Sequence, residues 1–169
     1  MKVAAPMFLK TPFLISGALA SCALALLAAP APTRAEVLYK LTTTCSLMGA
    51  DPQACTVEAE DFDRVTLYRH RIGAITKTVR VTDTPLKMEL YDADSKQWKQ
   101  LQSASARFSA NTVCFNGRDL CVVNPNYLNS VKEGRPELMA GRDLVRVHFD
   151  SNGRTNASCY DDGCDLVLK

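Results

Sequence analysis

The sequence predicts an all-β domain with mainly antiparallel strands, a small disulfide-stapled barrel or sandwich with at most one short helix. Three observations support this class. Apolar and polar residues alternate with period two from Val37 onward, as in strands with one buried and one solvated face. Turn-forming residues separate these segments at short intervals. The part of the chain that follows a leader-like segment also holds an even number of cysteines.

Residues 1–35 are typical of a secretory signal peptide. Lys2 and Lys10 form a basic start, an uncharged apolar stretch follows, and Ala35 ends a short segment suited to signal peptidase. Cleavage there leaves residues 36–169 as a single extracytoplasmic β-domain, secreted or periplasmic. Two alternatives stay open: lipidation of Cys22, which ends a lipobox-like sequence, and an uncleaved membrane anchor.

The strand segments follow one another along the chain. The clearest alternation covers residues 75–82, 87–91, 103–110 and 144–149, and turn signals fall at 71–73, 83–85, 92–95 and 151–153. The same alternation assigns His70 and His148 to the polar faces of their strands. Residues 135–140 are expected to form the one short helix, with Pro136 near its start and Gly141 after its end. Residues 124–129 are expected to form a loop, either a plain crossover or a binding loop.

The six cysteines of residues 36–169 fall into three couples that are close in sequence. Each couple is separated by turn formers, so a hairpin would bring its two members within bonding distance. Fifteen connectivities are possible, and the local one is favoured: Cys45 with Cys55, Cys114 with Cys121, and Cys159 with Cys164. For the middle couple, Phe115 is expected opposite Leu120, with residues 116–119 as a four-residue loop.

No catalytic residue, metal site or cofactor is predicted. The nucleophile, zinc-protease and nucleotide-binding motifs are not found in the sequence, and the cysteine spacings fit disulfides better than zinc. An acidic run holds Glu58, Glu60, Asp61 and Asp63, but it lacks the spacing of a calcium-binding loop. We expect it to be a solvated acidic segment.

A basic run follows the acidic one. If the chain turns near Gly73, the run gathers on two adjacent strands around Tyr68 as a patch for an anionic polymer or a lipid headgroup. In the competing interpretation, the acidic run neutralises these charges across strands. Tyr127, in the expected loop, is a further candidate. The candidate binding residues are therefore Tyr68, Arg69, Arg71, Lys77, Arg80 and Tyr127.

These patterns predict a non-catalytic exported β-domain that binds a protein, glycan or lipid partner in the envelope or outside the cell. Residues 36–169 are nearly neutral overall, so no nucleic-acid partner is expected, and no transmembrane helix is expected after processing. The alternative is a small-molecule carrier with an internal barrel cavity, for which the small residues Ala104, Ala106 and Ala110 around Phe108 would leave room. A further alternative is a hydrolase that uses His70 or His148.

Overall fold

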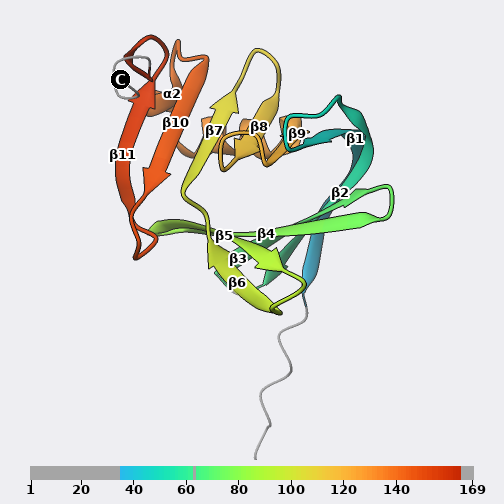
Figure 1. Cartoon of the computed structure of the whole chain (residues 1–169). Coiled ribbons are helices and arrows are strands. Elements are labelled where there is room, and N and C mark those ends of the chain that lie inside the picture. The colour runs from blue at the N-terminus through green and yellow to red at the C-terminus, as the bar shows by residue number, and fades with distance from the viewer. Residues whose placement is uncertain (1–34, 63, 165–169) are drawn as a thin grey trace, which may run out of the picture. The chain divides into compact units, whose positions relative to one another are not determined.

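The computed structural model describes residues 35–62 and 64–164 (Figure 1). The predicted signal peptide, with its possible lipidation site at Cys22, lies outside the described residues except for Ala35, and so does Asp63 of the acidic run. Among the described residues, no helix is long and apolar enough to cross a membrane.

The predicted all-β class is confirmed: eleven strands form one antiparallel sheet that curls into a half-barrel (Figure 1). The strands are β1 (Glu36–Leu47), β2 (Gln53–Phe62), β3 (Val65–Ile72), β4 (Ile75–Asp83), β5 (Leu86–Asp92), β6 (Gln97–Gln100), β7 (Ser103–Arg107), β8 (Thr112–Phe115), β9 (Leu120–Val123), β10 (Leu144–Phe149) and β11 (Thr155–Tyr160). Their order in the sheet is β11-β10-β7-β8-β9-β1-β2-β3-β4-β5-β6.

Strand β1 joins the two halves of the sheet. It pairs with β2 along almost its whole length, but with β9 only through Cys45, Ser46 and Leu47. The chain between β6 and β7 draws the two ends of the sheet together, because Leu101 N donates to Met88 O at 3.0 Å and Phe149 N donates to Gln102 O at 2.9 Å. The sheet is therefore curled but still open along its edge strands, β6 and β11.

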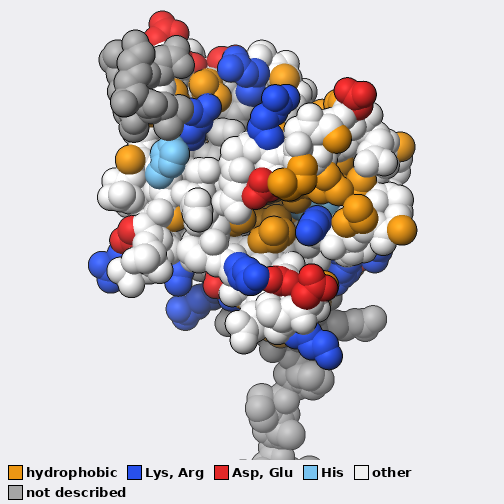
Figure 2. Space-filling view, viewed as in Figure 1, with side chains coloured by type: hydrophobic (Ala, Val, Ile, Leu, Met, Phe, Trp, Pro, Cys, Tyr) orange, Lys and Arg blue, Asp and Glu red, His pale blue; other side chains and the backbone are white. Residues whose placement is uncertain are grey.

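The core lies on the concave side of the sheet. Its buried members include Val57 on β2, Val79 on β4, Val113 on β8 and Val122 on β9. Figure 2 shows hydrophobic side chains gathered in a hollow between β1 and β9 on one side and β2 and β4 on the other, with charged side chains around it. Burying the apolar face of each strand against the others is the main favourable term for this fold.

The three local disulfides are confirmed: Cys45–Cys55, Cys114–Cys121 and Cys159–Cys164. The register of the middle hairpin is also as expected, with Cys114 opposite Cys121 and Phe115 opposite Leu120. Its loop turns through Asn116 and Gly117, both in the left-handed region with φ of 47° and 73°. Three disulfides indicate an oxidising, extracytoplasmic environment.

The described residues form two short helices rather than at most one. Helix α1 (Pro125–Gly134) occupies the expected loop, and α2 (Pro136–Met139) matches the expected helix with Pro136 in its first turn. The loop prediction was wrong because the Asn124-Pro125 pair begins a helix here. The Asn124 side chain caps it by accepting a hydrogen bond from Tyr127 N at 3.1 Å, and Pro125 takes a first-turn position that needs no N–H donor.

The expected exposure of His70 is wrong as well, because its side chain is only 1% exposed. On β3 the concave face receives Tyr68, His70 and Ile72, while Arg69 and Arg71 face the other way. The two arginines decide which face is buried, since an arginine cannot lose its charge and a neutral histidine or tyrosine is far cheaper to bury. His148, on β10, is half-buried.

Candidate functional site

A cavity of about 470 Å³ lies between the concave side of the sheet and the two helices. One side of its wall is formed by strands β3, β4, β5, β7, β8, β10 and β11, and the other side by α1 and α2. Helix α1 is held in place by Leu128, which is 1% exposed. The cavity thus exists because α1 spans the open side of the curled sheet without filling it.

Most of the cavity wall is apolar. Met88 lines it from β5, Val113 from β8, and Met139 from α2. Ala104 and Ala106 line it from β7, next to Phe108. Small side chains on β7 leave space that larger ones would occupy. Ala110, the third alanine of the predicted set, is exposed and does not line the cavity.

One end of the cavity is polar and aromatic. The rings of Tyr68 on β3 and Tyr127 on α1 meet edge to face, with centroids 5.4 Å apart and planes at 79°. Asp83, at the end of β4, lines the same cavity. Nearby, Tyr39 on β1 donates a hydrogen bond to Asn124 Oδ1 at 3.1 Å, which ties β1 to the start of α1.

The two cavity tyrosines are held in their neutral form. Burial raises the pKa of Tyr127, and the Asp83 carboxylate and Tyr39 raise it further. Burial also raises the pKa of Tyr68, followed by the effects of Tyr127, Tyr39 and Asp83. Both phenols therefore keep their protons at physiological pH, and each remains able to donate a hydrogen bond.

Two charged residues line the cavity in the described part of the chain. Asp83 and Arg135, which lies between α1 and α2, are both exposed to solvent. In the part of the chain that the structure describes, neither Asp83 nor Arg135 forms an ion pair. Glu58, Glu60 and Glu89, in contrast, are each paired with an arginine. The charges of Asp83 and Arg135 are therefore left available at the rim of an otherwise apolar space.

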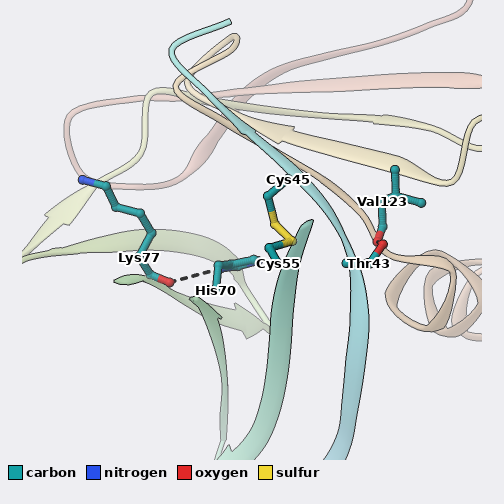
Figure 3. The surroundings of a disulfide bond; sticks show 6 residues. All are labelled: Thr43, Cys45, Cys55, His70, Lys77 and Val123. Carbon is teal, nitrogen blue, oxygen red and sulfur yellow. Dashed lines mark hydrogen bonds between the residues drawn. A yellow bond between two sulfur atoms is a disulfide. The ribbon is translucent and has the colours of Figure 1, made fainter. Parts of the chain in front are cut away.

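His70 lies deeper in the half-barrel, beside a second, very small cavity of about 10 Å³ that it shares with Tyr68 and Tyr127. Its Nδ1 is 3.2 Å from Lys77 O, and Figure 3 shows it close to the Cys45–Cys55 disulfide. Burial lowers its pKa from 6.5 to about 4, against the opposing effect of backbone hydrogen bonds with Lys77 and Tyr68. The ring is therefore neutral and is held by main-chain groups.

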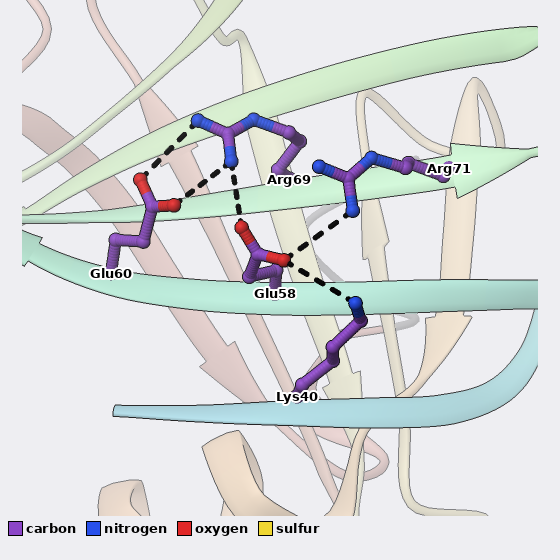
Figure 4. A network of polar contacts seen from close by, with 5 residues as sticks. All are labelled: Lys40, Glu58, Glu60, Arg69 and Arg71. Carbon is purple, nitrogen blue, oxygen red and sulfur yellow. Dashed lines mark hydrogen bonds and ion pairs between the residues drawn. The ribbon is translucent and has the colours of Figure 1, made fainter. Parts of the chain in front are cut away.

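The predicted basic patch is largely paired with acids. Arg69 Nη1 donates to Glu58 Oε1 and to Glu60 Oε1, each at 2.9 Å, and Arg71 Nη1 lies 3.4 Å from Glu58 Oε2 (Figure 4). Lys40 on β1 joins the same network at 3.8 Å from Glu58. This is the cross-strand neutralisation of the competing interpretation.

The remaining candidate residues do not join that network. Arg80 Nε donates to Glu89 Oε2 at 2.7 Å, and its guanidinium lies 4.4 Å from the Trp98 ring centroid. Lys77 offers its backbone carbonyl to His70. Of the six candidates, the structure brings only Tyr68 and Tyr127 together in a cavity. We therefore do not propose an anionic-ligand patch.

Sequence reasoning missed Asp83, Met139 and Arg135 as cavity residues. The capping pair Asn124-Pro125, followed by apolar residues at Leu128 and Val131, is the signal that could have revealed the helix covering them. No group of three or more histidine, cysteine or carboxylate side chains placed to hold a metal ion occurs in residues 35–62 and 64–164. Comparison with protein-family models, curated proteins and solved structures finds no match for this chain.

Proposed function

We propose that this protein is an exported, non-catalytic carrier that binds a small, mainly apolar molecule between the concave side of its sheet and helices α1 and α2. The observation that carries the proposal is the cavity of about 470 Å³. This volume falls within the range of about 300–1,000 Å³ that is usual for small-molecule sites. At roughly 30 Å³ per heavy atom, the volume share of a water molecule in the liquid, it has room for about 16 heavy atoms.

The chemistry of the wall supports an apolar ligand. Residues such as Met88, Val113 and Met139 offer contact without hydrogen bonding. Moving apolar surface from water into such a space gains about 25 cal/mol for each Å². The Tyr68 and Tyr127 end offers hydrogen bonds that would orient one polar group of the ligand. A few polar groups in an apolar wall are the usual arrangement of a binding site.

We favour binding over catalysis for this cavity. His70 and His148 are not among the residues that line it, and the hydrogen bonds of His70 go to main-chain groups. The raised pKa values of Tyr68 and Tyr127 leave both phenols poorly suited to act as bases near pH 7. A hydrolase that uses either histidine therefore has no support from the geometry of this site.

The proposed carrier works outside the cytoplasm, either secreted or in a periplasm. The leader-like residues 1–35 and the three disulfides support this location. Among the predicted partners, a lipid-like molecule fits the cavity best. We favour a carrier over a domain that binds a macromolecule, because a carrier needs an internal cavity and a domain that binds a macromolecule on its surface does not.

A binding titration tests the proposal. The probe is N-phenyl-1-naphthylamine, a neutral apolar fluorophore that brightens when it leaves water. The exported protein should bind it with a saturating 1:1 signal. Ala106→Trp, which fills the cavity from β7, should weaken binding at least about tenfold. Ala110→Trp, a matched change four residues away at an exposed position, should leave binding unchanged.

Two results would count against a carrier. The first is no saturable binding of the fluorophore by the exported protein. The second is equal binding by Ala106→Trp and the wild type, with circular dichroism showing that the variant is folded. The latter would place the bound probe outside the cavity.

A further inference from the structure

The polar end of the cavity combines three features that recognise a cation. Asp83 supplies a carboxylate, and Tyr68 and Tyr127 supply aromatic rings in contact with one another. A positively charged nitrogen gains from a nearby carboxylate and from the negative face of an aromatic ring, most strongly where water is partly excluded. Among the described residues that line the cavity, Asp83 is the one carboxylate.

The other aromatic rings of the cavity already have cations from the chain itself. Lys132 Nζ lies 4.9 Å from the ring centroid of Phe108, and the guanidinium of Arg142 lies 3.6 Å from that of Tyr160. No such contact is made with Tyr68 or Tyr127 by the described residues. The aromatic pair beside the free carboxylate is thus the one that lacks a cation.

We infer that the ligand of the cavity is a cationic amphiphile, whose ammonium group lies beside Asp83 and the rings of Tyr68 and Tyr127 and whose apolar body extends between β7 and α2. This inference rests on the proposed carrier function and names the ligand class for that site. Tyr127 links the two parts of the site, because it belongs to the helix that covers the apolar space and its ring contacts Tyr68.

Arg135 is the competing charge, and its position weakens it as an anion site. It follows directly after α1, and its backbone N–H donates to Val131 O. The last carbonyls of a helix carry partial negative charge, which offsets a cation beside them. Asp83 and Arg135 are both exposed, so solvent and salt screen the two charges alike, and what distinguishes Asp83 is the aromatic pair beside it. An anionic ligand would therefore gain less at Arg135 than an ammonium group gains at Asp83.

The test compares amphiphiles that share one chain length and differ in their head group. Decylamine, decanoate and decanol each compete with N-phenyl-1-naphthylamine for the exported protein at pH 7, below their aggregation concentrations. We expect decylamine to displace the probe at a concentration at least about tenfold lower than decanoate, because Asp83 attracts the ammonium and repels the carboxylate and the tyrosine rings add cation–π contact. Decanol should fall between the two.

Two variants assign the preference to Asp83. Asp83→Asn should bring the ratio of decanoate to decylamine affinity constants close to one and leave decanol binding unchanged, which also shows that the variant is folded. Asp94→Asn removes a carboxylate from an exposed turn on the β5–β6 connection and should keep the wild-type ratio.

The outcomes separate this inference from the function on which it rests. If decanoate binds more tightly than decylamine and Arg135→Gln removes that advantage, the site is anionic and the inference is overturned, while the carrier function stands. An unchanged ratio in Asp83→Asn also overturns it. If neither the fluorophore nor any of the amphiphiles binds, the proposed function itself has failed.

Discussion

Acid should destabilise this protein through one buried histidine. His70 is 1% exposed, and burial lowers its pKa from 6.5 to about 4. In the unfolded chain the imidazole takes up a proton as the pH falls below 6.5, but in the folded protein it does so only near pH 4. Between these values the unfolded state binds more protons, so the free energy of unfolding decreases as the pH decreases.

The size of the effect follows from the gap between the two pKa values. Each pH unit of difference corresponds to about 1.4 kcal/mol, so a drop from 6.5 to about 4 gives a loss of about 3 kcal/mol. The stabilisation is fully present above pH 6.5, declines through the window from 6.5 to 4, and changes no further below pH 4. A loss of this size is a large fraction of the stability of an ordinary domain.

Urea unfolding at pH 7.5, 6, 5 and 4.5, with the disulfides intact, measures this loss. His70→Gln removes the titrating group and keeps an N–H that can donate to Lys77 O, so its unfolding free energy should depend far less on pH over this window. His148→Gln, the same substitution at the half-buried histidine of β10, serves as the matched control for loss of an imidazole. A flat profile for the wild type would refute the reasoning, and so would an unchanged slope in His70→Gln.

Three further changes test the packing and the pairings. Asn124→Ala removes the cap of α1 and leaves the Tyr39 hydroxyl without its acceptor, so chemical denaturation should show a loss of about 2–3 kcal/mol. Replacing both Cys45 and Cys55 with Ala opens a loop with a sequence separation of 10 and should lower the free energy of unfolding by about 3 kcal/mol relative to the oxidised wild type. Reduction of all three disulfides in the wild type should lower it by more. Arg69→Ser with Arg71→Ser should lower the thermal midpoint slightly, and the difference should shrink in 1 M salt. An unchanged midpoint with loss of an anionic partner would instead restore the patch that we set aside.

Much of the fold could be predicted because its signals are local. Alternation marks a strand within a few residues, and a hairpin brings nearby cysteines together, as Cys114 and Cys121 show. The curl of the sheet could not be predicted from the sequence. It depends on the pairing of Cys45 with Val122 and on main-chain hydrogen bonds that link β5 and β10 to the β6–β7 connection. No short pattern encodes contacts between such distant segments.

The candidate site could be predicted only in part. Ala104, Ala106 and Phe108 were identified as possible cavity residues because strand alternation turns small side chains inward. Tyr68 is predicted to lie in a surface patch, but it lines the cavity. The prediction is wrong because Thr66, Tyr68 and His70 make one face of β3 look polar and therefore solvated. Asp83 lies in a turn whose sequence looks like any other exposed turn. Its relation to Tyr68 and Tyr127 arises from tertiary structure alone.

Methionine methyl NMR tests the central claim most directly. Residues 36–169 contain three methionines: Met88, 3% exposed, and Met139 line the cavity, whereas Met48, 79% exposed, lies in the turn after β1. In exported protein labelled at its methionine methyl groups, decylamine should shift the Met88 and Met139 signals with 1:1 saturation and leave Met48 in place. Shifts at Met48 alone, or none at a concentration that displaces the fluorophore, would contradict a ligand in this cavity.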